Sequence, residues 1–283
     1  MAQPALGLQI RQLEQELGVD LLTRHSRGVV PTEAGRLLLE RARTIIREIE
    51  NTAREVRALG NVSGETLTLG VTPSIMLQIG PDILIDAREE MPQVFLSLVE
   101  ELSFLLLEAL ERGELDLAFA YDTPERPGLE RTPVLEEDLL FITPGPGGLM
   151  GEPIGLAEVL QRDLVLAGEK DIVRRIVRAE ADKAGLALKV PYEVQSVPAM
   201  RAMVKRGAAA SIMPYGTAVE ELKAGTLSAR RIVDPPLRRH LHLVRPANRT
   251  PFRQEAEIAR FLTRIERRLA DSLGGLARPF GSG

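Results

Sequence analysis

Apolar residues in the first sixty positions recur at helical spacing. The intervals of four, three and four residues place one group on a single helix face: Leu6, Ile10, Leu13 and Leu17. Pro4 suits the first turn of this helix, and Gly18 suits its end. Short apolar stretches at 21–24 and 28–31 flank a polar tip at 25–27 and predict a two-stranded ribbon. Thr32 is a good N-cap for a second helix, which we expect to run to about Leu59.

The second helix carries a narrow apolar seam with heptad spacing. The intervals alternate between four and three residues, with Thr52 as the polar interruption, and the apolar members are Leu38, Ala42, Ile45, Ile49, Val56 and Leu59. A helix of this length cannot bury so narrow a stripe in one small domain, so we expect it to pair with a second copy of itself as the dimerisation element. The alternative is a helix packed along its own domain. Residues 60–64 read as a hinge.

From Glu65 onward, short strands alternate with helices, which predicts parallel sheets covered by helices on both faces. We expect strands near 67–71, 94–100, 115–120, 131–135, 139–143, 164–167, 192–194, 211–213, 227–233 and 241–245, and helices near 73–90, 104–112, 172–185, 198–207 and 251–273. The Pro/Gly break at 144–148 and the sequence Asp234-Pro235-Pro236 suggest two subdomains. Subdomain I would span about 65–143 and 237–283, and subdomain II about 144–236.

Composition narrows the function classes. The 283 residues suggest about two domains, and 44% hydrophobic with 27% charged residues is typical of globular chains. The absence of cysteine excludes disulfides, thiolate nucleophiles and zinc–thiolate sites. There is no long apolar run for a membrane span and no export signal, so we expect a cytoplasmic protein. No phosphate-binding loop, dinucleotide fingerprint, metalloprotease motif or nucleophile elbow is present, so we expect neither an enzyme nor a cofactor.

Charge is unevenly distributed around the net value of −4. Between Arg24 and Arg47 six arginines face only two glutamates, Glu33 and Glu40, which gives this segment a charge of +4. A basic segment can bind nucleic acid in a mildly acidic protein because the local field decides the interaction. A solvated helix face is the alternative.

The N-terminal sequence resembles the LysR-type transcriptional regulators. The resemblance rests on Gln3–Glu14, Glu16–Gly18, Arg24–Val29 and Pro31–Gly35, which match the recognition helix, wing and linker helix of that family's winged helix-turn-helix domain. The strand–helix order downstream is similar to the family's effector domain. The resemblance therefore implies an α/β architecture: a partial winged helix-turn-helix (1–31), a linker and dimerisation helix (32–59), and a two-subdomain, periplasmic-binding-protein-like (type 2) effector domain (65–283).

Several residues of the N-terminal segment are candidates for DNA contact. A helix that begins Gln-Pro presents amide and backbone donors at the end that enters a major groove, glutamines can read base edges, and arginines can engage phosphates. The candidates are Gln3, Pro4, Ala5, Gln9, Arg11, Arg24, Arg27 and Thr32, with surface solvation as the alternative. His25 reads as an exposed loop histidine.

Two departures from the family pattern affect this expectation. The commoner pattern has Ser and Arg where this sequence has Gly7 and Leu8. The family also has about thirty residues before the position of Gln3, which form two helices of the same small core. We therefore expect the polypeptide of residues 1–283 alone to bind operator DNA weakly. The alternative function is a stand-alone ligand-binding module, a ligand sink or a dominant-negative partner, without competent DNA binding.

In the effector domain, the resemblance implies a small-molecule effector, such as a small organic acid, bound in the cleft between the subdomains. Thr72, Ser74 and Ser103 follow strands and open helices, where free N–H groups favour anions, although plain N-capping explains them equally well. Gly168 and Asp171 could complete the pocket from the other side. Arg174 and Arg175 read mainly as an exposed helix face, and His240 and His242 as structural or surface residues without a third metal ligand.

The resemblance also implies how such a protein works. A ligand in the cleft would shift the population of subdomain arrangements and reposition the DNA-binding ends. The expected partners are double-stranded promoter DNA, the effector, and further copies of the chain in a homodimer and a homotetramer, with contact to RNA polymerase left open. An exported solute-binding protein shares the two-lobed fold, but the first sixty residues exclude it.

Overall fold

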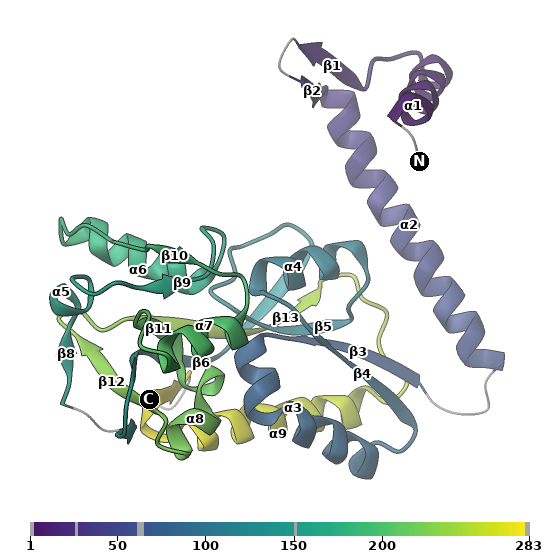
Figure 1. Ribbon diagram of the computed structural model, residues 1–283. Coiled ribbons are helices and arrows are strands. Elements are labelled where there is room, and N and C mark those ends of the chain that lie inside the picture. Colours follow the sequence, from purple (N-terminus) through teal and green to yellow (C-terminus); the bar gives the residue numbers. More distant parts are fainter. Residues whose placement is uncertain (1–2, 26–27, 61–64, 150–151, 281–283) are drawn as a thin grey trace. The chain divides into compact units, whose positions relative to one another are not determined.

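The computed structural model describes residues 3–25, 28–60, 65–149 and 152–280. The chain divides into two compact units, Met1–Gly60 and Asn61–Gly283, and each is described by itself. Figure 1 labels most of the elements in both units.

The N-terminal unit consists of a helix, a two-stranded ribbon and a long helix. Their bounds are α1 Gln3–Leu17, β1 Leu22–His25, β2 Gly28–Pro31 and α2 Glu33–Gly60. The Glu14 carboxylate accepts hydrogen bonds from the backbone N–H groups of Leu21 and Leu22, at 2.8 and 3.1 Å, and so fixes the turn between α1 and the ribbon. The predicted ribbon and both helices are therefore present.

The corner between the ribbon and α2 is built by Thr32 and Gly35. The Thr32 hydroxyl donates to the Asp20 carbonyl at 2.7 Å and accepts from the Gly35 N–H at 3.0 Å, which confirms the predicted N-cap. Leu21 is buried beside this corner. A Cβ on Gly35 would overlap the carbonyl oxygen of Leu21, so only glycine permits this close approach.

The second unit is built on a mixed sheet with the strand order β4-β3-β5-β13-β6-β12-β7. The first half contains β3 Glu65–Val71, α3 Pro73–Glu90, β4 Val94–Glu100, α4 Ser103–Arg112, β5 Leu117–Tyr121 and the start of β6 Leu129–Pro144. The second half contains β7 Gly148–Leu149, β8 Ile154–Gly155, α5 Leu156–Val159, β9 Val165–Leu166, α6 Ile172–Lys183, β10 Tyr192–Glu193, α7 Val197–Lys205, β11 Ser211–Pro214, α8 Val219–Lys223 and β12 Leu227–Val233. β13 Arg238–Pro246, α9 Glu255–Leu273 and β14 Ala277–Pro279 then return to the first half.

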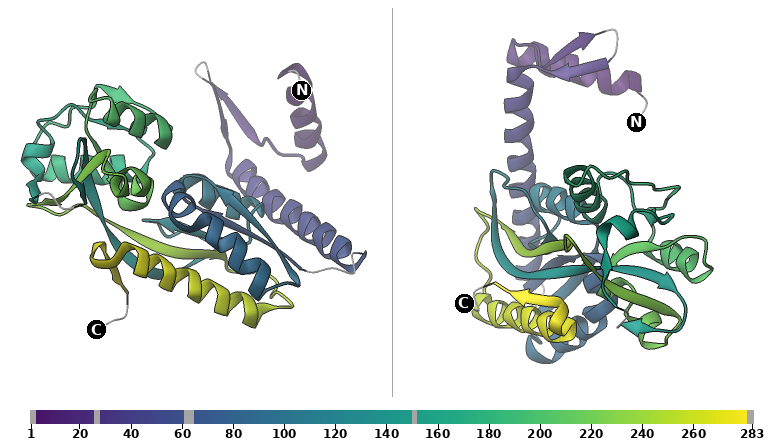
Figure 2. Two further views of the ribbon diagram at one scale, coloured as in Figure 1. Left: turned by 60° about the horizontal axis from the view of Figure 1, so that its bottom comes forward. Right: turned by 90° about the vertical axis from the view of Figure 1, so that its left-hand side faces the viewer.

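Strand alternation in the first half sorts residues between two helical layers. On β5, Leu117, Phe119 and Tyr121 pack in one core cluster with residues of α3 and α9, whereas Ala118 and Ala120 pack with α4 on the other face. α3 and α9 lie side by side (Figure 2). Both faces of the central strand β5 are therefore buried.

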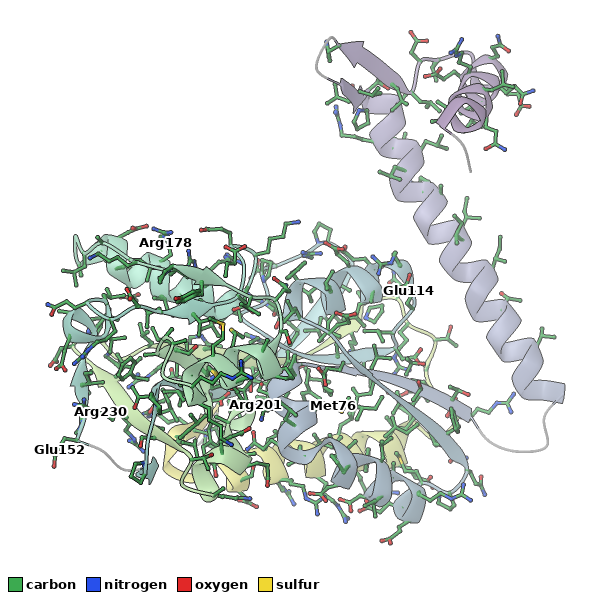
Figure 3. All side chains as sticks on the ribbon, viewed as in Figure 1. Met76, Glu114, Glu152, Arg178, Arg201 and Arg230 are labelled. Atoms are coloured by element: carbon green, nitrogen blue, oxygen red, sulfur yellow. The ribbon has the colours of Figure 1, made fainter. Side chains whose placement is uncertain are left out.

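The second half has its own core, in which β6 alternates again. Leu139 and Phe141 pack with α5 and α6, and Leu140 and Ile142 pack with α7 and α8. The core partners of β6 therefore change between Leu135 and Leu139, a few residues before the subdomain boundary of about 143 that the Pro/Gly break suggested. Arg230 on β12 donates to the carbonyl oxygens of Glu152 and Pro153 and so links β12 to the segment before β8 (Figure 3).

Two expectations about the strands were wrong. The strands expected at 131–135 and 139–143 form one strand, β6, because the Glu136–Asp138 run between them pairs with Arg238–His240 of β13. A register shift between Leu241 and His242 leaves Val134, next to Pro133, as a bulge without a paired residue on β13. The sheet is also not purely parallel: β3 runs parallel to β4 and β5, but β13 is antiparallel to both β5 and β6.

Candidate functional site

The second unit contains a cleft of about 360 Å³ onto which four helices point their first turns. α3 and α4 belong to the first half, and α6 and α7 to the second. The polar and charged residues that line the cleft are Thr72, Ser74, Glu100, Glu101, Ser103, Asp171, Gln195, Ser196, Thr217 and Arg239. The apolar wall is made of Pro73, Leu102, Leu105, Leu166, Ala167, Ile172, Val173, Val197, Pro198, Met200, Ile212 and Pro214.

Arg239 is the cation of the cleft and is held on three sides. Its Nε and Nη2 donate to one carboxylate oxygen of Glu137, at 2.9 and 2.7 Å, and Nη2 also donates to the Ser74 hydroxyl at 2.8 Å. The guanidinium lies 3.4 Å from the centre of the Tyr121 ring, a cation–π contact. Within the described residues the side-chain hydrogen bonds of Arg239 come from Nε and Nη2, and the residue lines the cleft, which leaves Nη1 as a donor for a ligand.

Burial is the largest influence on the pKa values of Arg239, Tyr121 and Asp171. Burial lowers the pKa of Arg239, but the charge and hydrogen bonds of Glu137, together with Tyr121 and Asp122, outweigh it and the pKa is raised. Burial raises the pKa of Tyr121 well above its usual value, against the attraction of Arg239. Burial likewise raises the pKa of Asp171, against backbone N–H donors and the more distant Arg239.

The structure brings four of the five expected effector residues together. Thr72, Ser74, Ser103 and Asp171 line the cleft, whereas Gly168 does not. The Thr72 and Ser74 hydroxyls lie 3.2 Å apart, and the Ser103 hydroxyl accepts from the Tyr121 N–H at 3.0 Å. Whether these residues bind an effector stays a prediction.

Other charged candidates fall outside the cleft. Arg174 does not lie on an exposed helix face as we expected: it is buried, with Nη2 3.5 Å from Glu169, because α6 turns this side toward the core. His240 pairs with Asp122 at 2.9 Å. The part of the chain that the structure describes holds no cluster of three His, Cys, Asp or Glu able to bind a metal.

Sequence reasoning missed Arg239, Glu137 and Tyr121. Each residue lies on an observed strand but just outside the strands that we expected from the sequence. The ion pair joins positions about a hundred residues apart in the chain. The sequence signal for this ion pair is an acidic run, Glu136–Asp138, together with a basic run of the same length, Arg238–His240. The sequence alone does not show that these two runs pair in register.

Among the described DNA-binding candidates, five lie on α1, Arg24 lies on β1 and Thr32 directly precedes α2. Gln9 and Arg11 are exposed on α1, and Thr32 is engaged in the corner described above. The side chains of Gln3, Pro4, Ala5 and Arg24, and the whole of Arg27, lie outside the described residues. Their contact with DNA stays a prediction.

The apolar seam of α2 is largely uncovered. Ile45, Ile49 and Val56 are 59%, 62% and 60% exposed, whereas Leu38 and Ala42 are partly buried. The side chain of Leu59 lies outside the described residues. The exposed isoleucines and valine form one stripe on a long helix, as the heptad spacing indicates.

Comparison with known proteins decides the family. Residues 60–268 match the LysR substrate binding domain, and residues 1–36 match the bacterial regulatory helix-turn-helix protein of the lysR family. The chain belongs to the LysR family of bacterial transcriptional regulators. It is therefore a DNA-binding regulator with a helix-turn-helix segment and a periplasmic-binding-protein-like effector domain.

Individual LysR proteins support this assignment. The nitrogen assimilation regulatory protein nac of Klebsiella aerogenes is 31% identical over 244 residues, which cover 86% of this chain and 79% of nac. A probable hydrogen peroxide-inducible genes activator of Streptomyces viridosporus is 30% identical over 277 residues, or 96% of this chain and 87% of that protein.

Solved structures share the fold. A cysteine mutant of Corynebacterium glutamicum OxyR has a TM-score of 0.65 at 22% identity, covering 96% of this chain and 85% of that one. Full-length CbnR in complex with its target DNA has a TM-score of 0.58 at 23% identity, covering 95% and 91%. No helix among the described residues of this LysR protein is long and apolar enough to cross a membrane.

Proposed function

We propose that this LysR regulator is controlled by a small molecule that carries an anionic group and binds in the cleft between the halves of its effector domain. One observation carries the proposal: Arg239 is buried, oriented by Glu137, Ser74 and Tyr121, and exposes donor capacity where the first turns of α3 and α4 begin. A fixed guanidinium beside two helix N-termini favours a carboxylate because no donor has to be reorganised on binding.

The cleft lies where a ligand can affect the whole domain. Its walls come from both halves, and Arg239 and Glu137 lie on the two strands, β13 and β6, that run between them. A ligand that contacts both walls favours the arrangement in which they are close. This change would alter how residues 1–60 of paired chains engage promoter DNA.

The N-terminal unit supplies the contacts with DNA and the partner chain in this proposal. Gln9 and Arg11, exposed on α1, would contact the duplex together with the ribbon. The stripe of Ile45, Ile49 and Val56 would form the dimer interface, because three large apolar side chains exposed in a row gain by mutual burial. Dimers would pair further into a tetramer through the effector domains.

Cysteine chemistry does not contribute to the response. Some of the similar proteins are named for hydrogen peroxide. This sequence contains no cysteine, so a response through thiol oxidation is not open to it. The proposal therefore rests on ligand binding.

A matched pair of probes tests the anionic requirement. We expect 4-methylpentanoate to raise the melting temperature of the full chain, and the neutral 4-methylpentan-1-ol, of the same carbon skeleton, to leave it unchanged. The double variant Glu137→Gln/Arg239→Gln removes the guanidinium without stranding a charge and should abolish the shift. Equal shifts with acid and alcohol would overturn the proposal.

The control variant uses a second ion pair on the same two strands. Arg245 on β13 and Glu130 on β6 lie 2.8 Å apart, half-exposed and away from the cleft. Glu130→Gln/Arg245→Gln makes the same change of charge and should keep the response to 4-methylpentanoate.

A further inference from the structure

The two walls of the cleft differ in how their helix N-termini are satisfied. On the second wall, Asp171 caps α6 by accepting from the N–H groups of Val173 and Arg174, and Ser196 caps α7 by accepting from Ala199. On the first wall, the cap residues Thr72 and Leu102 make no such bond to α3 or α4 within the described chain. Free donors for an anion are therefore concentrated on the first wall.

A ligand that carries only negative charge would not balance the charged residues that line the cleft. Glu100, Glu101 and Asp171 line it, and none has an ion-pair partner among the residues that the structure describes. Arg239 is the single guanidinium in the lining, and Glu137 behind it already compensates its charge. A ligand with only negative charge meets three unpaired carboxylates, whereas a ligand that also carries a cation gains from them.

Asp171 is the carboxylate best placed for that cation. It is partly buried on the wall opposite the free donors, and its hydrogen bonds come from backbone N–H groups at the start of α6. Arg239 acts on Asp171 through its charge but forms no ion pair with it, so this partly buried carboxylate gains an ion pair and charge-assisted hydrogen bonds when an ammonium group arrives. Glu100 and Glu101, both exposed, add negative potential.

Apart from Gln195, Ser196 and Thr217, the remaining lining of the second wall is apolar. Leu166, Val197, Met200 and Ile212 face the cleft there, and methionine adapts to side chains of different shape. The volume of about 360 Å³ is that of a site for a small molecule. The wall therefore suits an aliphatic or thioether side chain of a ligand.

We propose that the cleft takes a zwitterion, an α-amino acid with an apolar side chain, whose carboxylate binds the first turns of α3 and α4 beside Arg239 and whose ammonium binds Asp171. This inference rests on the proposed function and specifies its ligand class. A dicarboxylate is the less favoured ligand because its second anionic group would face Asp171 across the cleft.

Four probes separate the contributions of the ligand groups. Isothermal titration of the full chain compares L-leucine with 4-methylpentanoate, which lacks only the amino group, with 3-methylbutylamine, which lacks the carboxylate, and with the dicarboxylate glutarate. We expect leucine to bind about tenfold more tightly than 4-methylpentanoate, the size of one charge-assisted hydrogen bond. The amine and glutarate should bind more weakly than leucine.

Asp171→Asn tests the ammonium contact. Asparagine caps a helix as well as aspartate does, so α6 is retained, and leucine should lose its advantage over 4-methylpentanoate. Asp171→Ser, also a good cap, serves as the second variant if the first fails to fold. The control is Asp182→Asn, an exposed residue near the other end of α6, which should keep the full preference for leucine.

Every outcome bears on the proposal. A preference for leucine that survives in both Asp171 variants overturns the assignment of the ammonium. Equal binding of leucine and 4-methylpentanoate to the unaltered chain overturns the proposal of a zwitterionic ligand, as does tighter binding of glutarate or of the amine. In these cases the proposal of an anion-binding cleft stands only if 4-methylpentanoate binds. No binding by any probe overturns both proposals.

Discussion

Arg239 on β13 and Glu137 on β6 stand opposite each other in the sheet, and their side chains form an ion pair from which water is excluded. The exposed fractions are 4% for Arg239 and 1% for Glu137, and the shortest N–O distance is 2.7 Å. A buried pair of this kind adds little stability compared with an apolar pair, but either charge left alone is costly. Its value in this protein is that it orients a cation at the cleft.

Removing one partner of this pair should destabilise the domain strongly. Glu137→Ala leaves the Arg239 guanidinium buried without its counter-charge, and we expect the free energy of unfolding to fall by about 3–5 kcal/mol. Urea denaturation followed by circular dichroism measures the change. As a control, Glu130→Ala breaks the half-exposed pair with Arg245 and should cost about 1 kcal/mol or less. Similar losses in the two variants would refute the burial argument.

His242 should make the stability depend on pH. Burial, helped by repulsion from Arg131, lowers the pKa of His242 below its usual 6.5, against the attraction of Asp122. As the pH falls through 6.5, the unfolded chain takes up a proton that the folded chain does not yet bind, so the folded state loses stability. His242→Gln should reduce the loss between neutral and mildly acidic pH in urea denaturation. An unchanged pH slope in this variant would contradict the assignment.

The seam on α2 should control assembly. Ile45→Glu/Ile49→Glu places two like charges where a partner helix would pack, and we expect the sedimenting mass of the full chain to halve. Val29→Glu makes a similar apolar-to-acidic change at an exposed position of β2 and should leave the mass unchanged. An unchanged mass in the seam variant, measured by sedimentation velocity, would rule out dimerisation through α2.

The corner between the ribbon and α2 should tolerate no side chain at Gly35. In Gly35→Ala the new Cβ overlaps the backbone of Leu21, and we expect the N-terminal unit to lose about 1–3 kcal/mol. Gly7→Ala is the matched control, because nothing lies within 4 Å of its Cβ and alanine should stabilise α1 by about 0.5–1 kcal/mol. Amide hydrogen exchange in residues 3–60 measures both effects. Equal protection in the two variants would disprove the steric account.

Local patterns predicted most helices and strands because each depends on neighbours in sequence. The heptad spacing of Ile45, Ile49 and Val56 predicted a long helix with an exposed stripe, and Thr32 predicted its cap. Likewise, Ser74 and Ser103 could be placed at helix starts since strand and helix periods change there. Their meeting in one cleft follows from parallel strands whose carboxyl ends share an edge.

The features that escaped prediction depend on distant pairing. The acidic run Glu136–Asp138 lies between the two strands that we expected at 131–135 and 139–143. The bulge opposite Leu241 and His242, with the basic partners on β13, makes the segment one strand. Arg239 belongs to the site because this register aligns it with Glu137, and its neighbour Arg238 pairs with Asp138 and Glu136 instead. The spacing of charges along the chain does not fix such a register.

The central claim is that a ligand in the cleft changes how this regulator binds DNA. The most direct measurement is the affinity of the full chain for a duplex carrying the promoter of its own gene, by fluorescence anisotropy, without and with a saturating probe that raises its melting temperature. The account predicts that the affinity changes by about fivefold or more, whatever its absolute value, and that Glu137→Gln/Arg239→Gln removes the change. The same affinity with and without the bound probe would contradict it.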